Sequence, residues 1–182
     1  MSIYREMLQK LKKILSKVVF ENNWWRYKID EYTLPDGSSG EYHYVQTTGS
    51  TMIIPQLNET TFVLTRQYRY LNGRISLEFP GGGIKKGLTA EQNAKEELEE
   101  EAGYAAERMK ELGEFNPFNG VTDEICKVFL AEDLSFIGAK PEQSEEFEII
   151  KMTSDEIEEK IKTGELWDGM SLASWSLYLT RR

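Results

Sequence analysis

The pattern of apolar and polar positions predicts a helix near the amino terminus of the chain. Across residues 3–18, apolar residues recur every three or four positions, which places them on one side of a helix. They are Ile3, Met7, Leu11, Ile14 and Val18, and the other face carries Arg5, Lys10, Lys12, Lys13 and Lys17. We expect this basic helix to dock on an acidic surface of the same chain or of a second copy, with a membrane-surface anchor as the alternative.

Strand patterns dominate the next part of the chain. Residues 24–45 contain two runs rich in aromatic and β-branched residues around Pro35-Asp36-Gly37, which is typical of a β-hairpin. Further strands are predicted at 51–55, 60–70, 74–79, 110–116, 124–131 and 147–152, and helices at 154–163 and 168–180. Mixed strands with helices before and after them predict an α/β fold in which a sheet lies between helices.

The most informative stretch runs from Phe79 to Tyr104. Three consecutive glycines lead into a predicted helix over residues 90–102, preceded by a capping box from Thr89 to Gln92 and ended by Gly103. An apolar stripe for packing recurs every four residues along this helix, formed by Ala94, Leu98 and Ala102.

Five glutamates crowd the end of the same helix. The helical period places Glu97 and Glu101 on one face with Glu100 beside them, and it turns Glu96 and Glu99 toward solvent. No Lys or Arg on the helix is spaced to neutralise the first three. Carboxylate oxygens suit Mg²⁺ and Mn²⁺, so the pattern indicates a divalent cation, and a solvated acidic face is the alternative.

Composition and charge limit the partners, the kinds of site and the compartment that this protein can have. The net charge of −9 and pI of about 4.8 disfavour nucleic-acid binding. One cysteine, Cys126, and one histidine, His43, exclude a disulfide framework and a zinc site built on either residue type. No apolar run approaches the length of a membrane span, and no signal peptide is visible. We expect a single-domain cytoplasmic protein with neither nucleic-acid nor membrane partners.

The glycine–glutamate stretch resembles the box of the Nudix hydrolase family. Seven positions match at the family's spacings: Gly82, Glu97, Leu98, Glu100, Glu101, Gly103 and Tyr104. Two positions depart, because Leu88 and Glu96 stand where the family has a Glu and an Arg that pair with each other. The later glutamates, which bind metal in the family, are all present.

The flanking segments resemble one branch of that family, the ADP-ribose and nucleoside-diphosphate-sugar pyrophosphatases. They are residues 24–37, 66–83, 120–134 and the carboxy-terminal GELWDGMSLASWSLYL, although this branch often has an acidic residue where Lys85 stands. The resemblance implies a Nudix α/β/α sandwich with a mixed sheet and an N-terminal β-hairpin domain. With the amphipathic helix, it gives three predicted segments: 1–22, a dimerising 23–48, and a Nudix domain over 49–182.

The implied activity is metal-dependent hydrolysis of the diphosphate in ADP-ribose or a related nucleotide sugar. The products would be a nucleoside monophosphate and a sugar phosphate, and the enzyme would be a homodimer. Two alternatives stay open: a non-catalytic Nudix-like sensor of nucleotide sugars, and a hydrolase of dinucleoside polyphosphates.

The resemblance also assigns roles to individual residues. The carbonyl of Gly81, with Glu97 and Glu101, would hold Mg²⁺ or Mn²⁺, and Glu100 would be a shared ligand. Gly82 would let the backbone approach the substrate closely. Arg69 would bind the diphosphate.

Two further roles fall outside the box. The general base would be Glu145, from the loop after the sheet, with Glu146 and Glu142 as alternatives. The nucleobase would stack on Trp25 and Tyr42, for which a place in the core or in a dimer interface is the alternative.

Overall fold

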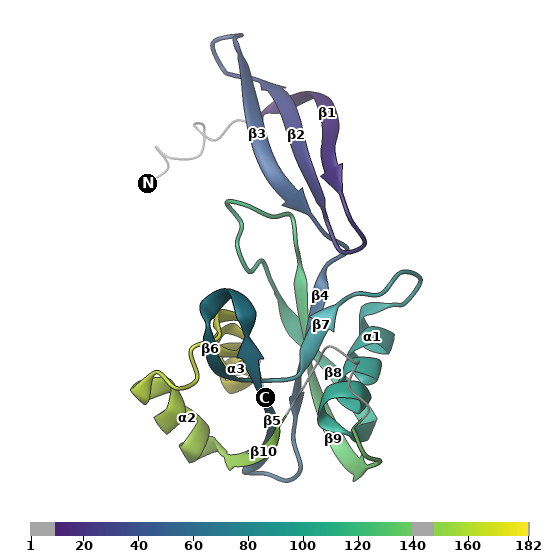
Figure 1. Cartoon of the computed structure of the whole chain (residues 1–182), viewed down its shortest axis with the longest axis vertical. Helices are drawn as coiled ribbons and strands as arrows, with labels where there is room; N and C mark the ends of the chain where they lie inside the picture. Colours follow the sequence, from purple (N-terminus) through teal and green to yellow (C-terminus); the bar gives the residue numbers. More distant parts are fainter. Residues whose placement is uncertain (1–9, 140–147, 182) are drawn as a thin grey trace, which may run out of the picture. The chain divides into compact units, whose positions relative to one another are not determined.

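The computed structural model describes residues 10–139 and 148–181, which fall into two compact units (Figure 1). The first unit consists of the described residues up to Thr47 together with Phe118–Glu124, and the second of Thr48–Pro117 with Ile125 onward. Among the described residues, no helix is both long and apolar enough to cross a membrane.

The first unit is a three-stranded antiparallel sheet in the order β1-β2-β3. Its strands are β1 (Lys12–Glu21), β2 (Arg26–Thr33) and β3 (Ser39–Gln46). The predicted hairpin is confirmed as β2 and β3, and its turn has Gly37 at φ +87° with the Asp36 carboxylate accepting from Ser38 N at 3.0 Å. The 118–124 segment adds to β3, since Val45 N donates to Val121 O at 2.8 Å.

The predicted amino-terminal helix is wrong where the structure describes it, because Lys12–Glu21 forms β1. Residues 3–9 of that prediction lie outside the described residues. Two register shifts interrupt the pairing of β1 with β2, and they leave Ile14 and Val19 without a direct cross-strand partner. Each bulge adds one residue to the strand and so breaks its two-residue alternation. The apolar positions therefore imitate a helical period.

The second unit contains two sheets. The four-stranded sheet has the order β7-β4-β9-β8, and the three-stranded sheet has the order β10-β5-β6. Only β4 and β9 pair in parallel among the described strands, so the sheet is mixed as predicted. The strands are β4 (Ser50–Pro55), β5 (Thr61–Arg69), β6 (Arg74–Glu78), β7 (Gly81–Gly83), β8 (Tyr104–Phe115), β9 (Cys126–Phe136) and β10 (Glu148–Thr153).

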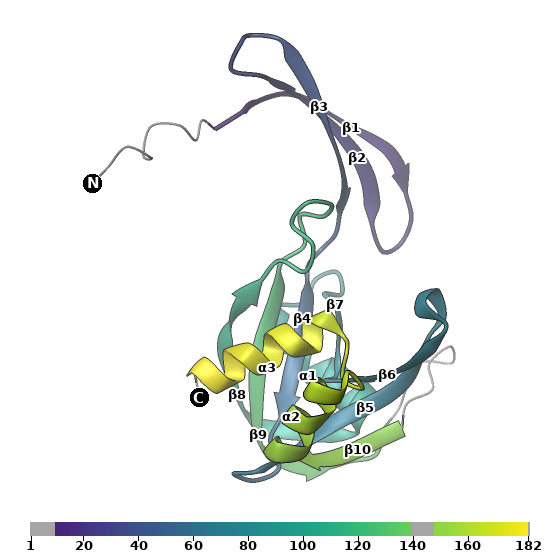
Figure 2. The same ribbon diagram turned by 90° about the vertical axis from the view of Figure 1, so that its left-hand side faces the viewer.

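Helices cover the strands of the second unit on both sides. They are α1 (Ala90–Glu97), which continues as the π-helical turn η2 (Leu98–Ala102), then α2 (Ser154–Thr163) and α3 (Gly169–Arg181); a 3₁₀ turn, η1 (Tyr70–Asn72), joins β5 to β6. In Figures 1 and 2, α1 lies on one side of the strands and α2 and α3 on the other. The predicted bounds of α2 and α3 hold to within one residue, whereas β8 begins earlier and β9 ends later than predicted.

Alternating side chains of the central strands fill a core on each face. Ile53 and Val63 pack with Ala94, Leu98 and Ala102 under α1, so the predicted apolar stripe is buried. The neighbouring Ile54, Phe62 and Leu64 pack with Trp175 and Tyr178 of α3. Because β4 and β5 are buried on both faces, their apolar runs are continuous, as expected for the centre of a layered α/β fold.

Packing of α3 also holds the strand that leads into the glycines. Phe79 stacks on Trp175 with ring centroids 5.8 Å apart, and Phe79 N donates to Ser171 Oγ at 3.0 Å. Phe79 is followed directly by Pro80 and β7, so this contact fixes the entry of the glycine loop.

Candidate active site

The glutamates lie where α1 changes into a wider turn. The predicted capping box is present, with Gln92 N donating to Thr89 Oγ1 at 3.2 Å and Thr89 N donating to Gln92 Oε1 at 2.9 Å. After Glu97 the helix continues as the π-helical η2 and ends at Gly103, whose φ is +72°. π-Helical turns are rare and frequent at functional sites, so the sequence places its acidic cluster on an unusual backbone segment.

Two of these glutamates are buried against the glycine strand. Glu97 and Glu101 are 8% and 6% exposed, and Gly81 N donates to Glu101 Oε2 at 2.9 Å. A Cβ at Gly82 would lie 2.7 Å from the carboxyl carbon of Glu97, and one at Gly81 would lie 2.3 Å from Thr51 O. Both positions therefore require glycine, which lets the β7 backbone reach the two carboxylates.

A lysine from outside the helix, which the helical spacing did not predict, neutralises part of the cluster. Lys85 Nζ, from the loop after β7, lies 2.7 Å from Glu100 Oε2, 3.5 Å from Glu96 Oε2 and 3.9 Å from Glu97 Oε1. Burial opposes the charge of Lys85, but its hydrogen bond to Glu100 and the neighbouring carboxylates raise the pKa of the ammonium group above its ordinary value. Glu96 is thus not turned wholly away from the cluster, because it shares this lysine with Glu100.

Asn93 ties the same loop to the helix. This buried side chain accepts from Lys85 N at 2.9 Å and donates to Thr51 Oγ1 of β4 at 3.0 Å. A loop-to-helix link therefore exists although Leu88 and Glu96 cannot form the family's ion pair. Sequence reasoning missed Asn93; an asparagine inside a helix, where its propensity is poor, was the available signal.

Arg69 lies at the end of β5 on a buried carboxylate. Its Nε donates to Glu78 Oε1 at 2.7 Å and its Nη2 donates to Glu78 Oε2, while Glu78 is only 3% exposed. The hydrogen bond to Glu78 raises the pKa of Arg69 despite burial, and the charges of Asp168 and Glu101 add to this effect. Sequence reasoning missed Glu78 and Asp168. For Glu78, the available signal was a glutamate in the strand directly before Phe79.

The remaining predicted residues belong to the first unit or lie outside the described residues. Trp25 and Tyr42 belong to the first unit, where Trp25 lies 5.5 Å from the Phe20 ring and the Tyr42 hydroxyl donates to Gly120 O at 3.1 Å. Their side chains are 38% and 45% exposed. Glu142, Glu145 and Glu146 lie outside the described residues.

The residues around Gly81 and Gly82 fit an open cation site. Among residues 10–139 and 148–181, no group of three or more His, Cys, Asp or Glu side chains is placed to hold a metal ion. The structure instead offers two buried carboxylates beside a glycine strand that a Cβ would block. Mg²⁺ is commonly bound through one or two carboxylates while it keeps several waters, so this donor set suits such an ion.

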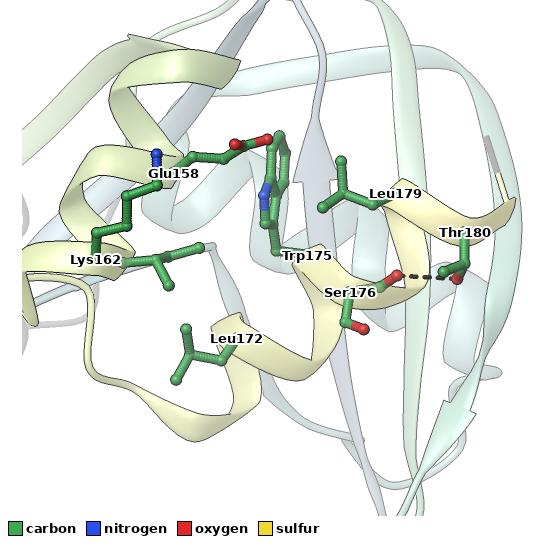
Figure 3. A pocket seen from close by; sticks show the side chains of 8 residues that line it. Glu158, Lys162, Leu172, Trp175, Ser176, Leu179 and Thr180 are labelled. Carbon is green, nitrogen blue, oxygen red and sulfur yellow. Dashed lines mark hydrogen bonds between the residues drawn. The ribbon is translucent and has the colours of Figure 1, made fainter.

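A concavity lies on the side of this unit that α2 and α3 cover (Figure 2). It is a pocket of about 400 Å³ between α2 and α3, with a mostly apolar lining (Figure 3). Ile161, Leu172, Trp175 and Leu179 supply the apolar part, with Glu158 and Lys162 among the polar residues. None of the glycine-strand or acidic-cluster residues lines it, so it is separate from the candidate active site.

Comparison with known proteins decides the family. The model described as "NUDIX domain" matches residues 47–172. The chain belongs to the Nudix family. The predicted family membership is therefore confirmed, and its Nudix box is the stretch whose glycines and glutamates meet in the structure.

Relatives of this Nudix protein include named pyrophosphatases. It is 29% identical to an ADP-ribose pyrophosphatase of Bacillus subtilis (strain 168), over 86% of each chain. It is 26% identical to a GDP-mannose pyrophosphatase of Escherichia coli (strain SMS-3-5 / SECEC), over 91% of this chain and 93% of that one. A methanol dehydrogenase activator of Bacillus methanolicus is 30% identical over 88% of each chain.

A solved structure supports the fold of this Nudix chain. The crystal structure of an ADP compounds hydrolase superposes with a TM-score of 0.81, covering 96% of this chain and 94% of that one at 19% identity. At that identity the likeness establishes the mixed α/β Nudix fold and nothing about substrate.

Proposed function

We propose that this Nudix protein hydrolyses the diphosphate linkage of ADP-ribose or a related nucleoside diphosphate sugar, releasing a nucleoside monophosphate and a sugar phosphate. The observation that carries the proposal is the burial of Glu97 and Glu101 against Gly81 and Gly82. The named pyrophosphatase relatives, which match most of their length, support the substrate class.

The proposed cofactor is Mg²⁺ or Mn²⁺. Glu97, Glu101 and the carbonyl of Gly81 would hold it, with Glu100 as a shared ligand. When bound, such an ion would neutralise charge on the diphosphate and lower the pKa of a water molecule. Two glycines of the chain position these carboxylates. Gly81 N donates a hydrogen bond to the Glu101 carboxylate, and Gly82, which lacks a Cβ, leaves room for the carboxylate of Glu97.

Arg69 is the proposed diphosphate ligand. Glu78 engages its Nε and Nη2, and no described residue makes a hydrogen bond to its Nη1. The planar guanidinium is thus held in one orientation with a donor to spare, which suits a phosphate oxygen. Its electrostatic coupling to Glu101 supports a place beside the proposed metal ligands.

For the general base we propose Glu145, with Glu146 and Glu142 as alternatives. Replacing the base by glutamine should lower kcat by about two orders of magnitude, because a positioned acid–base group contributes on that scale. Single-turnover rates of the three variants identify the base. Equal, near-wild-type rates for all three would remove this loop from the reaction.

We further propose that the first unit mediates a homodimer and supplies the nucleobase platform through Trp25 and Tyr42. Aromatic side chains are enriched at interfaces and also stack on bases. Support comes from β1, along which every residue is exposed, including Ile14, Val18 and Phe20. The segments 1–22, 23–48 and 49–182 and a reducing cytoplasmic setting remain predictions; burial of the Cys126 thiol is compatible with that setting.

A panel assay tests the activity. The full chain is incubated with ADP-ribose, ADP-glucose, GDP-mannose, UDP-glucose and a dinucleoside polyphosphate, each with Mg²⁺ or Mn²⁺, and phosphomonoester release is measured. The proposal expects release from at least one nucleotide sugar and loss of it in the Glu97→Gln/Glu101→Gln variant. Turnover of the dinucleoside polyphosphate alone would overturn the substrate class.

Binding without turnover is the result expected of a sensor. The relative named as a methanol dehydrogenase activator is the observation that keeps this second function in view. Calorimetric titration of ADP-ribose alongside the panel separates the two cases, since a sensor binds the ligand and returns it intact.

A further inference from the structure

The Nudix box of this chain already contains a positive charge. Lys85 Nζ contacts Glu100 Oε2 at 2.7 Å and lies within 4 Å of Glu96 and Glu97 as well. An ammonium group in that place partly cancels the repulsion among the carboxylates, and it uses an oxygen of one proposed metal ligand.

The loop backbone holds this lysine in place. Lys85 N donates to the buried Asn93 side chain at 2.9 Å, and Lys85 O accepts from Leu88 N at 3.1 Å. Both backbone groups are therefore engaged beside α1, and the side chain is only 37% exposed. The adjacent Lys86 is exposed and makes no ion pair with any described residue, although it belongs to the same loop.

We propose that Lys85 is a built-in counter-cation of the box that competes with the divalent metal for Glu100. Metal binding then has to displace the ammonium group, so Lys85 lowers metal affinity and stabilises the box when metal is absent. This inference rests on the proposed function only for the location of the metal, at Glu97, Glu100 and Glu101.

Mn²⁺ titration of the full chain without substrate provides the test. The variant Lys85→Gln keeps the length of the side chain and removes its charge. It should bind Mn²⁺ about fivefold tighter or more, the scale of one unit-charge interaction at 4 Å in water. Lys86→Gln, which removes a charge from the same loop, should leave the Mn²⁺ affinity unchanged.

Thermal unfolding is a second test, and it applies even if Lys85→Gln is less stable than the wild type. In EDTA the Tm of Lys85→Gln should lie below that of the wild type, and added Mn²⁺ should raise it more than it raises the wild-type Tm. In a Glu100→Gln background, Lys85→Gln should change Mn²⁺ affinity less, because the contact that couples the two residues is gone.

The outcomes separate this inference from the proposed activity. Tighter Mn²⁺ binding by Lys85→Gln, in a protein that hydrolyses none of the nucleotide sugars, would support the counter-cation and reject the activity. Turnover with Mn²⁺ affinity that is equal or weaker in Lys85→Gln would do the reverse. Absence of Mn²⁺ binding by wild type and Lys85→Gln alike would also overturn the inference.

Discussion

The two units of this Nudix protein differ in how many of their side chains they bury. The second unit packs both faces of β4 and β5 and buries aromatic clusters such as Phe62, Trp175 and Tyr178. In the first unit, Asp30 is the one buried residue among the described positions 10–47 and 118–124. A three-stranded sheet that leaves its apolar side chains in water buries little apolar surface of its own, which supports the proposal that the first unit has a partner surface.

The same division separates the candidate roles. Residues that depend on fixed geometry, the box glutamates and Arg69, lie in the unit with its own core. The two aromatic residues proposed to stack on a base lie in the unit with exposed apolar strands. Substitutions in the second unit should therefore affect unfolding and chemistry, and those in the first unit should affect assembly and KM.

A pair of phenylalanines tests the contrast most strongly. Phe62→Ala removes a ring that is 0% exposed and should lower the free energy of unfolding by about 3–5 kcal/mol. Phe20→Ala removes one that is 53% exposed and should cost less than about 1 kcal/mol in dilute protein. Denaturant unfolding measures both, and similar losses would mean that the first unit has a core of its own.

Two arginines of β5 allow a buried ion pair of the second unit to be compared with an exposed one. Arg69→Ala leaves the buried Glu78 carboxylate without its main partner and should cost about 3 kcal/mol of stability as well as raising KM. Arg66→Ala, which breaks an exposed pair with Glu148, should cost at most about 1 kcal/mol and leave KM unchanged. An Arg69→Ala protein with wild-type KM would exclude Arg69 from substrate binding.

Assembly should respond to charge on β1. Val18→Asp places a carboxylate among the exposed apolar residues of the proposed interface and should convert a dimer to monomer at micromolar concentration. Leu71→Asp makes the same kind of change on an exposed residue of the second unit and should leave the dimer intact. Light scattering reports the mass of each, and a wild-type monomer with full activity would contradict the dimer.

The smallest expected effects concern the base platform. Trp25→Ala or Tyr42→Ala should raise KM by about fivefold or more with little change in kcat, because each stacked base contributes about 1–3 kcal/mol of binding. Trp24→Ala removes a neighbouring ring that is 76% exposed and serves as the matched control. Unchanged KM in both test variants would place the nucleobase elsewhere.

Local signals predicted the second unit well. The capping box predicted at Thr89 is present, and α2 has the predicted bounds. The prediction of an amino-terminal helix was wrong because bulges at Ile14 and Val19 give the apolar residues of a strand a helix-like spacing. In that segment the run Val18-Val19-Phe20, rich in β propensity, was the better guide.

The site shows the same limit. Helical spacing correctly grouped Glu97 and Glu101, because residues four apart on a helix share a face, and both are buried. It could not reveal Lys85 or Asn93, because the contact between a loop and a helix depends on tertiary packing rather than on sequence spacing. Glu78 was not predicted for the same reason, since its partner Arg69 lies on another strand.

Adjacent glutamates give the most direct test of the central claim, that the buried face of the box holds the catalytic metal. Glu96→Gln and Glu97→Gln are assayed on ADP-ribose, or on the best substrate of the panel, with saturating Mg²⁺. The account predicts that Glu97→Gln lowers kcat/KM by about a hundredfold or more, nearly 3 kcal/mol of transition-state stabilisation, and that Glu96→Gln stays near wild type. Equal losses in the two variants, or wild-type turnover by Glu97→Gln, would contradict it.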